Sequence, residues 1–284
     1  MSNYAKGVIL ILLSSLFFTI NATAVKLLTN FPLYEKIFVR NFLGMLFILP
    51  IILKDKSSLK VNKSSFYKLI LRCVIGFLGL ATYYYAIDNM VLADATILNK
   101  LNAFFVMIFS FIFLSEKLKK YQVIAILFAF VGAAFVIKPT FDSSVVPSMF
   151  ALISAAFAGG AYTVIRGLSG KVKPVVIVFY FSTFTSLASI ILLIGTEIVI
   201  PNFKESLLLI LMGVSATIAQ VLMTSAYKYA EASRISIYNY SSIVFAIIST
   251  FILFSDVPDM YSLIGALIII SSGVYNYRIN IKRI

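Results

Sequence analysis

The stretch Leu92–Leu114 is long and apolar enough to cross a bilayer, yet its first half contains Asn99, Lys100 and Asn102. An ammonium group in hydrocarbon costs at least about 2.5–3.5 kcal/mol on insertion scales, so such a group usually faces a protein interior or a wet cavity. Lys100 is therefore the first candidate for a residue that contacts a solute. The alternative is a structural lysine that bonds to backbone carbonyls or to a buried acid.

Lys100 shares one stripe of the expected helix with polar and small residues, namely Thr96, Asn99, Ala103, Met107 and Ser110. The flanking faces consist of Phe, Ile, Val and Leu. A polar stripe on an otherwise apolar membrane helix is expected to face the protein interior. Asn99 and Lys100 are therefore predicted to line a binding cavity.

The rest of the chain has the composition of a polytopic membrane protein, because 61% of its 284 residues are hydrophobic. A spanning helix needs about 20 apolar residues. Ten such segments can be placed, at 5–28, 33–53, 66–88, 92–115, 121–139, 147–169, 174–196, 205–228, 232–255 and 260–279. The expected fold class is all-α integral membrane with ten transmembrane helices. The connections are short, so no water-exposed catalytic domain and no enzyme activity are expected.

Lysine and arginine residues are concentrated in alternate connections, which predicts the orientation. If the N-terminus lies inside, the outside segments carry only Lys36, Lys138 and Lys204. The inside segments then carry far more, among them Lys54, Lys56, Lys60, Lys63, Lys68, Arg72, Lys117, Lys119 and Lys120. Both termini are therefore predicted to be cytoplasmic. The same pattern explains the net charge of +13 without a nucleic-acid partner.

The two halves repeat with a constant offset of 140 residues. The offset relates Ser14, Phe17, Thr23 and Lys26 to Ser154, Phe157, Thr163 and Arg166, and it also relates Asn99 to Asn239 and Ser115-Glu116 to Ser255-Asp256. Each half contains five spans, so the second copy enters the membrane upside down. Two inverted five-helix repeats are predicted, at 1–140 and 141–284. Inverted repeats are typical of transporters, whose binding site lies near the midplane between the halves.

Several motifs resemble the EamA-type, ten-helix branch of the drug/metabolite transporter superfamily. They are Arg72 to Ala95 with Gly76 and Tyr85-Ala86, Phe113 to Glu116, Gly132, Lys138-Pro139, Tyr240 to Ala246, Phe254 to Asp259 and Gly265. The resemblance covers nearly the whole chain and implies transport of small metabolites across the cytoplasmic membrane. It does not give the substrate. Family members usually have proline at the position of Ala103, so a less kinked fourth helix is expected here.

The repeat supplies a partner for the Lys100 stripe on the ninth span. Tyr240 and Asn239 are equivalent to Lys100 and Asn99. Tyr240 and Lys100 are predicted to lie on facing sides of one cavity. The alternative for Tyr240 is a tyrosine packed in the core.

Four further residues are candidates for substrate contacts: Tyr162 in the sixth span, Gln220 in the eighth, Tyr83 in the third and Arg40 in the second. Gln220 could instead hold helices together, and Arg40 could pair with Glu35 or a carbonyl. The three successive residues Tyr83, Tyr84 and Tyr85 cannot share one face. One of them is expected to reach the cavity and the others to meet lipid headgroups.

Other residues, near the ends of spans and where helices cross, are expected to have structural roles. Lys26 and Arg166 are expected to snorkel to the interface, with a pocket role as the alternative. Glu116 and Asp256 are expected to pair with nearby cations such as Lys119 or to cap local structure, with gating as the alternative. Gly76 and Gly79 are expected to allow close helix packing.

The residue types that the chain lacks exclude several classes of function. The chain has no histidine and one cysteine, Cys73, so no cofactor, zinc site or haem site is expected. None of its eleven acids lies clearly at a span centre, which argues against carboxylate-based proton coupling. A cavity with cations and no central acid repels organic cations and suits a carboxylate-bearing solute or a zwitterion, amino-acid-like or nucleoside-like.

The sequence therefore predicts a bacterial inner-membrane carrier that works by alternating access as an exporter, uniporter or exchanger. Its expected partners are a small-molecule metabolite and membrane lipids. The oligomeric state stays open, and a monomer is compatible with the sequence. The alternatives are a membrane channel and a lipid-handling membrane protein. A lipid-acting enzyme would need clustered acids, histidines or a nucleophile triad, and none is visible.

Overall fold

The computed structural model describes residues 2–54, 59–138, 145–168, 170–229 and 235–281. These ranges contain helices and no strands. The helices are α1 (Asn3–Leu27), α2 (Leu33–Lys54), α3 (Lys63–Asn89), α4 (Leu92–Asn99), α5 (Asn102–Leu114), α6 (Lys120–Ile137), α7 (Val146–Leu168), α8 (Pro174–Leu193), α9 (Phe203–Tyr229), the 3₁₀ helix η2 (Ser236–Tyr240), α11 (Ser241–Phe254) and α12 (Met260–Ile281). Ten spans in the described ranges are long and apolar enough to cross a membrane, which confirms the predicted fold class.

Local sequence sets the ends of these helices. The Asn62 side chain accepts a hydrogen bond from the Ser65 backbone N–H at 2.8 Å and so caps the start of α3. Pro174 occupies the first turn of α8, where its missing N–H has no helical partner to lose. Ser115 and Ser255 end α5 and α11 in the left-handed region, with φ of 56° and 51°. These two serines differ by 140 in number, so the two spans end in the same way.

The fourth and ninth spans are interrupted. At the junction of α4 and α5, the hydrogen bonds Leu101 N→Leu98 O (3.0 Å) and Phe104 N→Leu101 O (2.9 Å) span three residues instead of four. In the ninth span, η2 passes into α11 at Tyr240. These three-residue hydrogen bonds interrupt the helix at Lys100 and Leu101 without any proline. That the helix is less kinked than in family members with a proline stays a prediction.

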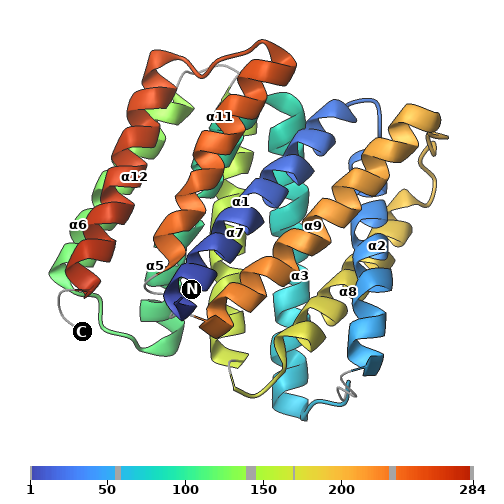
Figure 1. Ribbon diagram of the computed structural model, residues 1–284, viewed down its shortest axis with the longest axis horizontal. Helices are drawn as coiled ribbons and strands as arrows, with labels where there is room; N and C mark the ends of the chain where they lie inside the picture. The colour runs from blue at the N-terminus through green and yellow to red at the C-terminus, as the bar shows by residue number, and fades with distance from the viewer. Residues whose placement is uncertain (1, 55–58, 139–144, 169, 230–234, 282–284) are drawn as a thin grey trace.

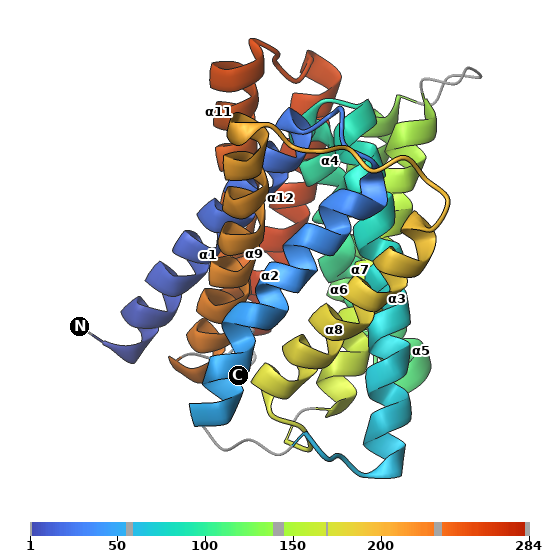
Figure 2. The ribbon, with the colours of Figure 1, turned by 90° about the vertical axis from the view of Figure 1, so that its right-hand side faces the viewer.

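The helices pack mainly in pairs that join the two halves of the chain. α1 packs along α9 and α3 along α7, while α6 pairs with α12 and α2 with α8. The α6–α12 pair forms one edge of the bundle and the α2–α8 pair the other (Figure 1). The view turned by 90° places α2, α8 and α3 in front (Figure 2). α1 begins and α12 ends at the same end of the bundle, as ten spans require (Figure 1).

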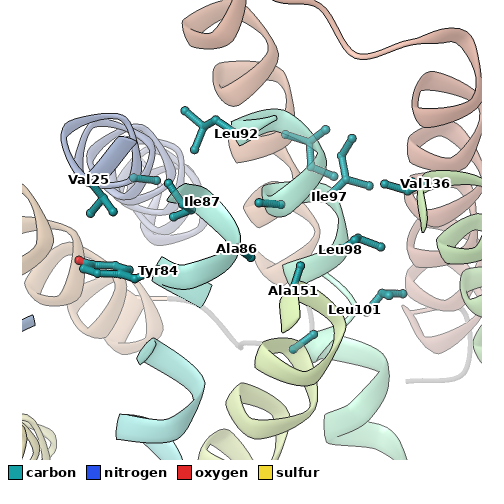
Figure 3. Packing of buried hydrophobic residues seen from close by; sticks show 14 of the residues in the cluster. Val25, Tyr84, Ala86, Ile87, Leu92, Ile97, Leu98, Leu101, Val136 and Ala151 are labelled. Carbon is teal, nitrogen blue, oxygen red and sulfur yellow. The ribbon is translucent and has the colours of Figure 1, made fainter. Parts of the chain in front are cut away.

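The main apolar cluster surrounds α4. It joins buried residues from ten helices, among them Val25 of α1, Ile87 of α3, Leu98 of α4, Val136 of α6 and Ala151 of α7 (Figure 3). Every residue of α4 up to Leu98 is buried. The half-helix that leads to Lys100 is therefore held firmly by its neighbours.

The α6–α12 pair depends on two facing glycines. A Cβ added at Gly265 would lie 2.5 Å from the carbonyl oxygen of Gly132, and one added at Gly132 would lie 2.8 Å from that of Gly265. We expect Gly265→Ala to destabilise the protein by about 1–3 kcal/mol, because backbone atoms must move apart. Thermal unfolding of the purified protein measures this.

Gly160→Ala is the matched control. Its Cβ would meet only side-chain atoms, the nearest at 3.5 Å. Alanine favours a helix over glycine by up to about 1 kcal/mol, so this variant should unfold at the wild-type temperature or slightly above it. Equal unfolding temperatures for the two variants would contradict the close α6–α12 contact.

Candidate functional site

Lys100 lies at the break between α4 and α5 and is partly buried. In the part of the chain that the structure describes, its ammonium group has no hydrogen-bond or ion-pair partner. The structural alternative, a lysine bonded to carbonyls or a buried acid, therefore has no support in the described residues. The role of Lys100 in binding a solute stays a prediction.

Asn99 and Asn102 hold the break in place. The Asn99 Nδ2 donates to Ser154 Oγ of α7 at 3.0 Å, and Asn102 Nδ2 approaches Asn99 Oδ1 at 3.5 Å. Ser154 in turn donates to the Ala151 carbonyl at 2.6 Å. A polar chain thus ties the end of α4 to the second half of the molecule.

Tyr240 lies at the corresponding break in the ninth span. Its ring packs on Gly273 of α12, where an added Cβ would lie 2.6 Å from both Cε2 and Oη of the tyrosine. The Asn239 carbonyl accepts a hydrogen bond from Ser242 Oγ at 2.9 Å. α4 and α11 touch each other, so the two breaks lie on neighbouring elements. That Lys100 and Tyr240 face each other across one cavity stays a prediction.

The three successive tyrosines of α3 each contact a different partner. Tyr83 Oη lies 3.3 Å from Thr96 Oγ1 of α4, and the Tyr85 ring lies 4.5 Å from the ring of Phe150, centroid to centroid. Tyr84 is 0% exposed, and its hydroxyl lies 3.3 Å from the Asn21 side chain. The expectation of a headgroup contact is wrong for Tyr84, because helix packing encloses it completely.

Arg40 of α2 is only 8% exposed. Its Nη1 donates to Asn41 Oδ1 at 3.2 Å, while its Nε has no partner. The alternative of a pair with Glu35 is wrong, since Glu35 Oε2 instead accepts from the Val199 backbone N–H at 3.2 Å. Arg40 thus places a guanidinium inside the bundle that forms no ion pair with any acid in the described ranges.

Arg72 is a candidate that sequence reasoning missed, because it was counted only among the cations of the inside segments, although it falls within the predicted span 66–88. It lies within α3, is 8% exposed, and has two nitrogens, Nε and Nη1, without partners. Its guanidinium stacks 4.3 Å from the ring centroid of Phe181 in α8. A Cβ at Gly76 would collide with Arg72 Nη1 and with Phe181, so this glycine makes room for the guanidinium. Gly79, by contrast, packs α3 on α7 at Phe157, as predicted.

Tyr162 belongs with the arginines. It interacts electrostatically with both Arg72 and Arg40. Tyr162 keeps 36% of its surface accessible. Lys100 has no electrostatic contact with either arginine. The predicted residues therefore fall into two groups, one at the helix breaks and one around Arg40 and Tyr162.

Gln220 in α9 is partly buried. Among the described residues its side chain has no hydrogen-bond partner, so neither substrate contact nor helix bridging is favoured. No group of three His, Cys, Asp or Glu residues that could hold a metal ion occurs in the described ranges. The chemistry available inside the bundle is therefore that of cations, amides and hydroxyls.

Two lysines at one end of the bundle, here named the Lys36 end, are bonded within the protein. Lys36 is 0% exposed and its Nζ lies 2.6 Å from Asp88 Oδ2. Lys26 donates to the backbone carbonyls of Asp88 and Met90 at 3.1 and 3.0 Å. Lys26 is thus bonded within the protein, which corrects the expectation that it snorkels to the interface.

Two further ion pairs lie near span ends. At the end opposite the Lys36 end, Glu116 pairs with Arg166 at 3.0 Å, so it has a cationic partner as expected, and that partner is Arg166 instead of Lys119. That Arg166 snorkels to the interface stays a prediction. At the Lys36 end, Lys138 pairs with Asp259, which also accepts from the Ser262 N–H and so caps α12. Although burial alone would raise the pKa of Asp259, these bonds hold the pKa of that carboxyl below its usual value.

Two open grooves of about 460 and 430 Å³ lie along α12, the second between α12 and α6. Their walls include Phe128, Leu267, Ser271 and Tyr275. None of the predicted binding residues lines either groove. Both belong to the apolar edge of the bundle and are spaces that lipid chains would fill.

The Lys36–Asp88 pair predicts a specific order of stabilities. Asp88→Asn leaves a buried ammonium without its counter-ion and should destabilise the protein by about 3–5 kcal/mol. The double variant Lys36→Met/Asp88→Leu removes both charges and should recover most of this loss. Unfolding in detergent measures all three proteins. A double variant that is less stable than Asp88→Asn would contradict the charge-pair explanation.

The sequence profile of the EamA-like transporter family matches the chain twice, over residues 5–138 and 146–277. The pseudopaline exporter CntI of Pseudomonas aeruginosa is 33% identical over 266 residues, which cover 93% of each chain. Human solute carrier family 35 member G1 is 27% identical over 283 residues, covering 94% of this chain and 78% of that protein.

A solved crystal structure supports the fold alone. It superposes with a TM-score of 0.66 at 18% identity and covers 96% of this chain and 94% of the other. The two profile matches leave out only the ends of the chain and the connection between α6 and α7. The chain belongs to the EamA-like transporter family.

Proposed function

We propose that this protein carries a small organic metabolite across the membrane by alternating access, using residues 1–140 and 141–284 as two inverted repeats. The observation that carries the proposal is the pair of breaks at Lys100 and Tyr240, which are related by the offset of 140 residues. Broken helices near the midplane are where transporters with inverted repeats hold their substrates. The pairing of α1 with α9 and of α3 with α7 supports the same symmetry.

The proposed location is the bacterial cytoplasmic membrane, with both termini inside. The excess of lysine and arginine on one side supports this orientation. Arg72 is buried within α3, and leaving it out of the count for that side keeps the bias intact. The Lys36 end then faces outward, and the Glu116–Arg166 pair lies at the cytoplasmic end.

The proposed substrate carries a carboxylate or is a zwitterion, amino-acid-like or nucleoside-like. Lys100 and Arg40 supply positive charge within the bundle, and neither forms an ion pair with a described acid. Tyr83, Tyr162, Tyr240, Asn99, Asn239 and Gln220 complete the proposed set of contacts. The name of the relative CntI states that it exports pseudopaline, which favours export as the direction among exporter, uniporter and exchanger.

The substrate can be found by screening the purified protein against a metabolite library by thermal shift and testing each hit in counterflow. Lys100→Met should reduce saturable counterflow of an anionic or zwitterionic hit about tenfold or more, because a charged hydrogen bond contributes about 1.5–3 kcal/mol. Lys117→Met is the matched control, since Lys117 lies exposed between α5 and α6.

Three results would count against the proposal. Flux that does not saturate would indicate a channel. Unchanged counterflow of every identified substrate in Lys100→Met would remove Lys100 from the site. An equal loss in the Lys117→Met control would show a general charge effect in place of a local contact.

A further inference from the structure

Arg40 and Arg72 are two buried cations with unused hydrogen-bond donors. Each is 8% exposed, and three of their nitrogens, Arg40 Nε and Arg72 Nε and Nη1, are buried without a partner. A buried donor without an acceptor costs about 1–3 kcal/mol, and more when the group is charged. Guanidinium groups stay protonated in proteins, so this cost cannot be relieved by loss of a proton.

No described acid compensates these two charges. Glu35 is bonded to the Val199 N–H, Asp88 pairs with Lys36, and Glu116 pairs with Arg166. The electrostatic neighbours of the Arg72 guanidinium are Tyr162, Cys73 and Arg40, of which Arg40 repels it. An arrangement that places two like charges near each other inside a bundle is unfavourable unless an anion joins them.

The surroundings orient the arginines for such an anion. Stacking on Phe181 holds the plane of the Arg72 guanidinium, and Asn41 holds one nitrogen of Arg40. Gly76 leaves the room that Arg72 Nη1 itself occupies beside the Phe181 ring. The planar guanidinium matches the oxygens of a carboxylate or phosphate, often with two parallel bonds. Tyr162, which interacts with both arginines and has accessible surface, adds a hydroxyl donor.

Arg40 and Arg72 also lie at a depth in the membrane that suits a transport site. At about 1.5 Å per residue, Arg40 lies about 21 Å and Arg72 about 14 Å from the ends of their helices opposite the Lys36 end, well within the hydrocarbon layer of about 30 Å. α2 and α3 belong to the first half of the chain, whereas Tyr162 and Phe181 belong to the second. A ligand bound here would touch both halves.

We infer that Arg40, Arg72 and Tyr162 form a binding site for an oxyanion, the carboxylate or phosphate of the transported solute. This inference rests on the proposed transport function. It adds a second cationic position to that of Lys100, which lies at the break between α4 and α5.

The test uses the full-length protein in nanodiscs of phosphatidylcholine, which exclude anionic lipid headgroups as the source of the oxyanion. The probes are glutamate and inorganic phosphate, with choline as the cationic control, and the readouts are calorimetric affinity and the unfolding temperature. We expect at least one anion to bind and stabilise the wild type, and choline to do neither. Arg40→Gln and Arg72→Gln should each weaken anion binding at least tenfold.

Arg278→Gln is the matched control, because Arg278 is an exposed residue in the last turn of α12. It should bind the anions as tightly as the wild type. Arg72→Lys keeps the buried charge, and it serves as the test variant if the glutamine variants do not fold. It should bind the anion at least threefold more weakly than the wild type, because lysine lacks the planar fork.

The inference is overturned if neither anion binds the wild type, or if the folded Arg40 and Arg72 variants bind as tightly as the wild type. Counterflow with the same proteins separates this result from the proposed function. Saturable transport that is unchanged in the variants of both arginines would disprove the oxyanion site and leave the proposed carrier function standing. Anion binding that requires both arginines, in a protein that shows no counterflow, would support the oxyanion site and disprove the proposed carrier function.

Discussion

The absence of water from the bilayer core is the constraint on which the rest of this structure depends. A backbone group in hydrocarbon must find its partner within its own segment, so spans are helices, and breaks survive only inside protein or beside water. Two spans break here, after Asn99 and at Tyr240, at positions related by 140 residues. Buried α4 and the Asn99–Ser154 hydrogen bond support the first break from the second half of the chain.

Charge follows the same constraint. At the span ends the protein neutralises its own charges, through Lys36–Asp88, Lys138–Asp259 and Arg166–Glu116. In the middle, among the described residues, Lys100 and the two arginines have no acidic partner. Paired charges can hold an end of the bundle closed without a ligand. Unpaired charges inside the bundle make the empty protein less stable and favour whatever anion enters.

Hydropathy alone located the spans well, because bilayer thickness sets their length. The predicted segment 121–139 corresponds to Lys120–Ile137, and 205–228 to Phe203–Tyr229. The break at Lys100 could not be predicted from proline rules, since Ala103 replaces the expected proline and the support comes from contacts across the fold. Arg72 was overlooked for a similar reason. From the sequence it is one more cation near the start of a span, whereas its burial depends on the room left by Gly76 and on the ring of Phe181.

The repeat and the charges finally show what duplication kept and what it did not. Helix pairing and the left-handed ends at Ser115 and Ser255 are shared by both halves. The positions that correspond to Arg40 and Arg72 hold Tyr180 and Met212, and Met212 is fully buried. The shared features are thus matters of packing, whereas the cations inside the bundle, Lys100, Arg40 and Arg72, have uncharged counterparts. In the proposed carrier, the first half supplies the charge that recognises the solute, while the second supplies Tyr162 and Phe181 to orient it.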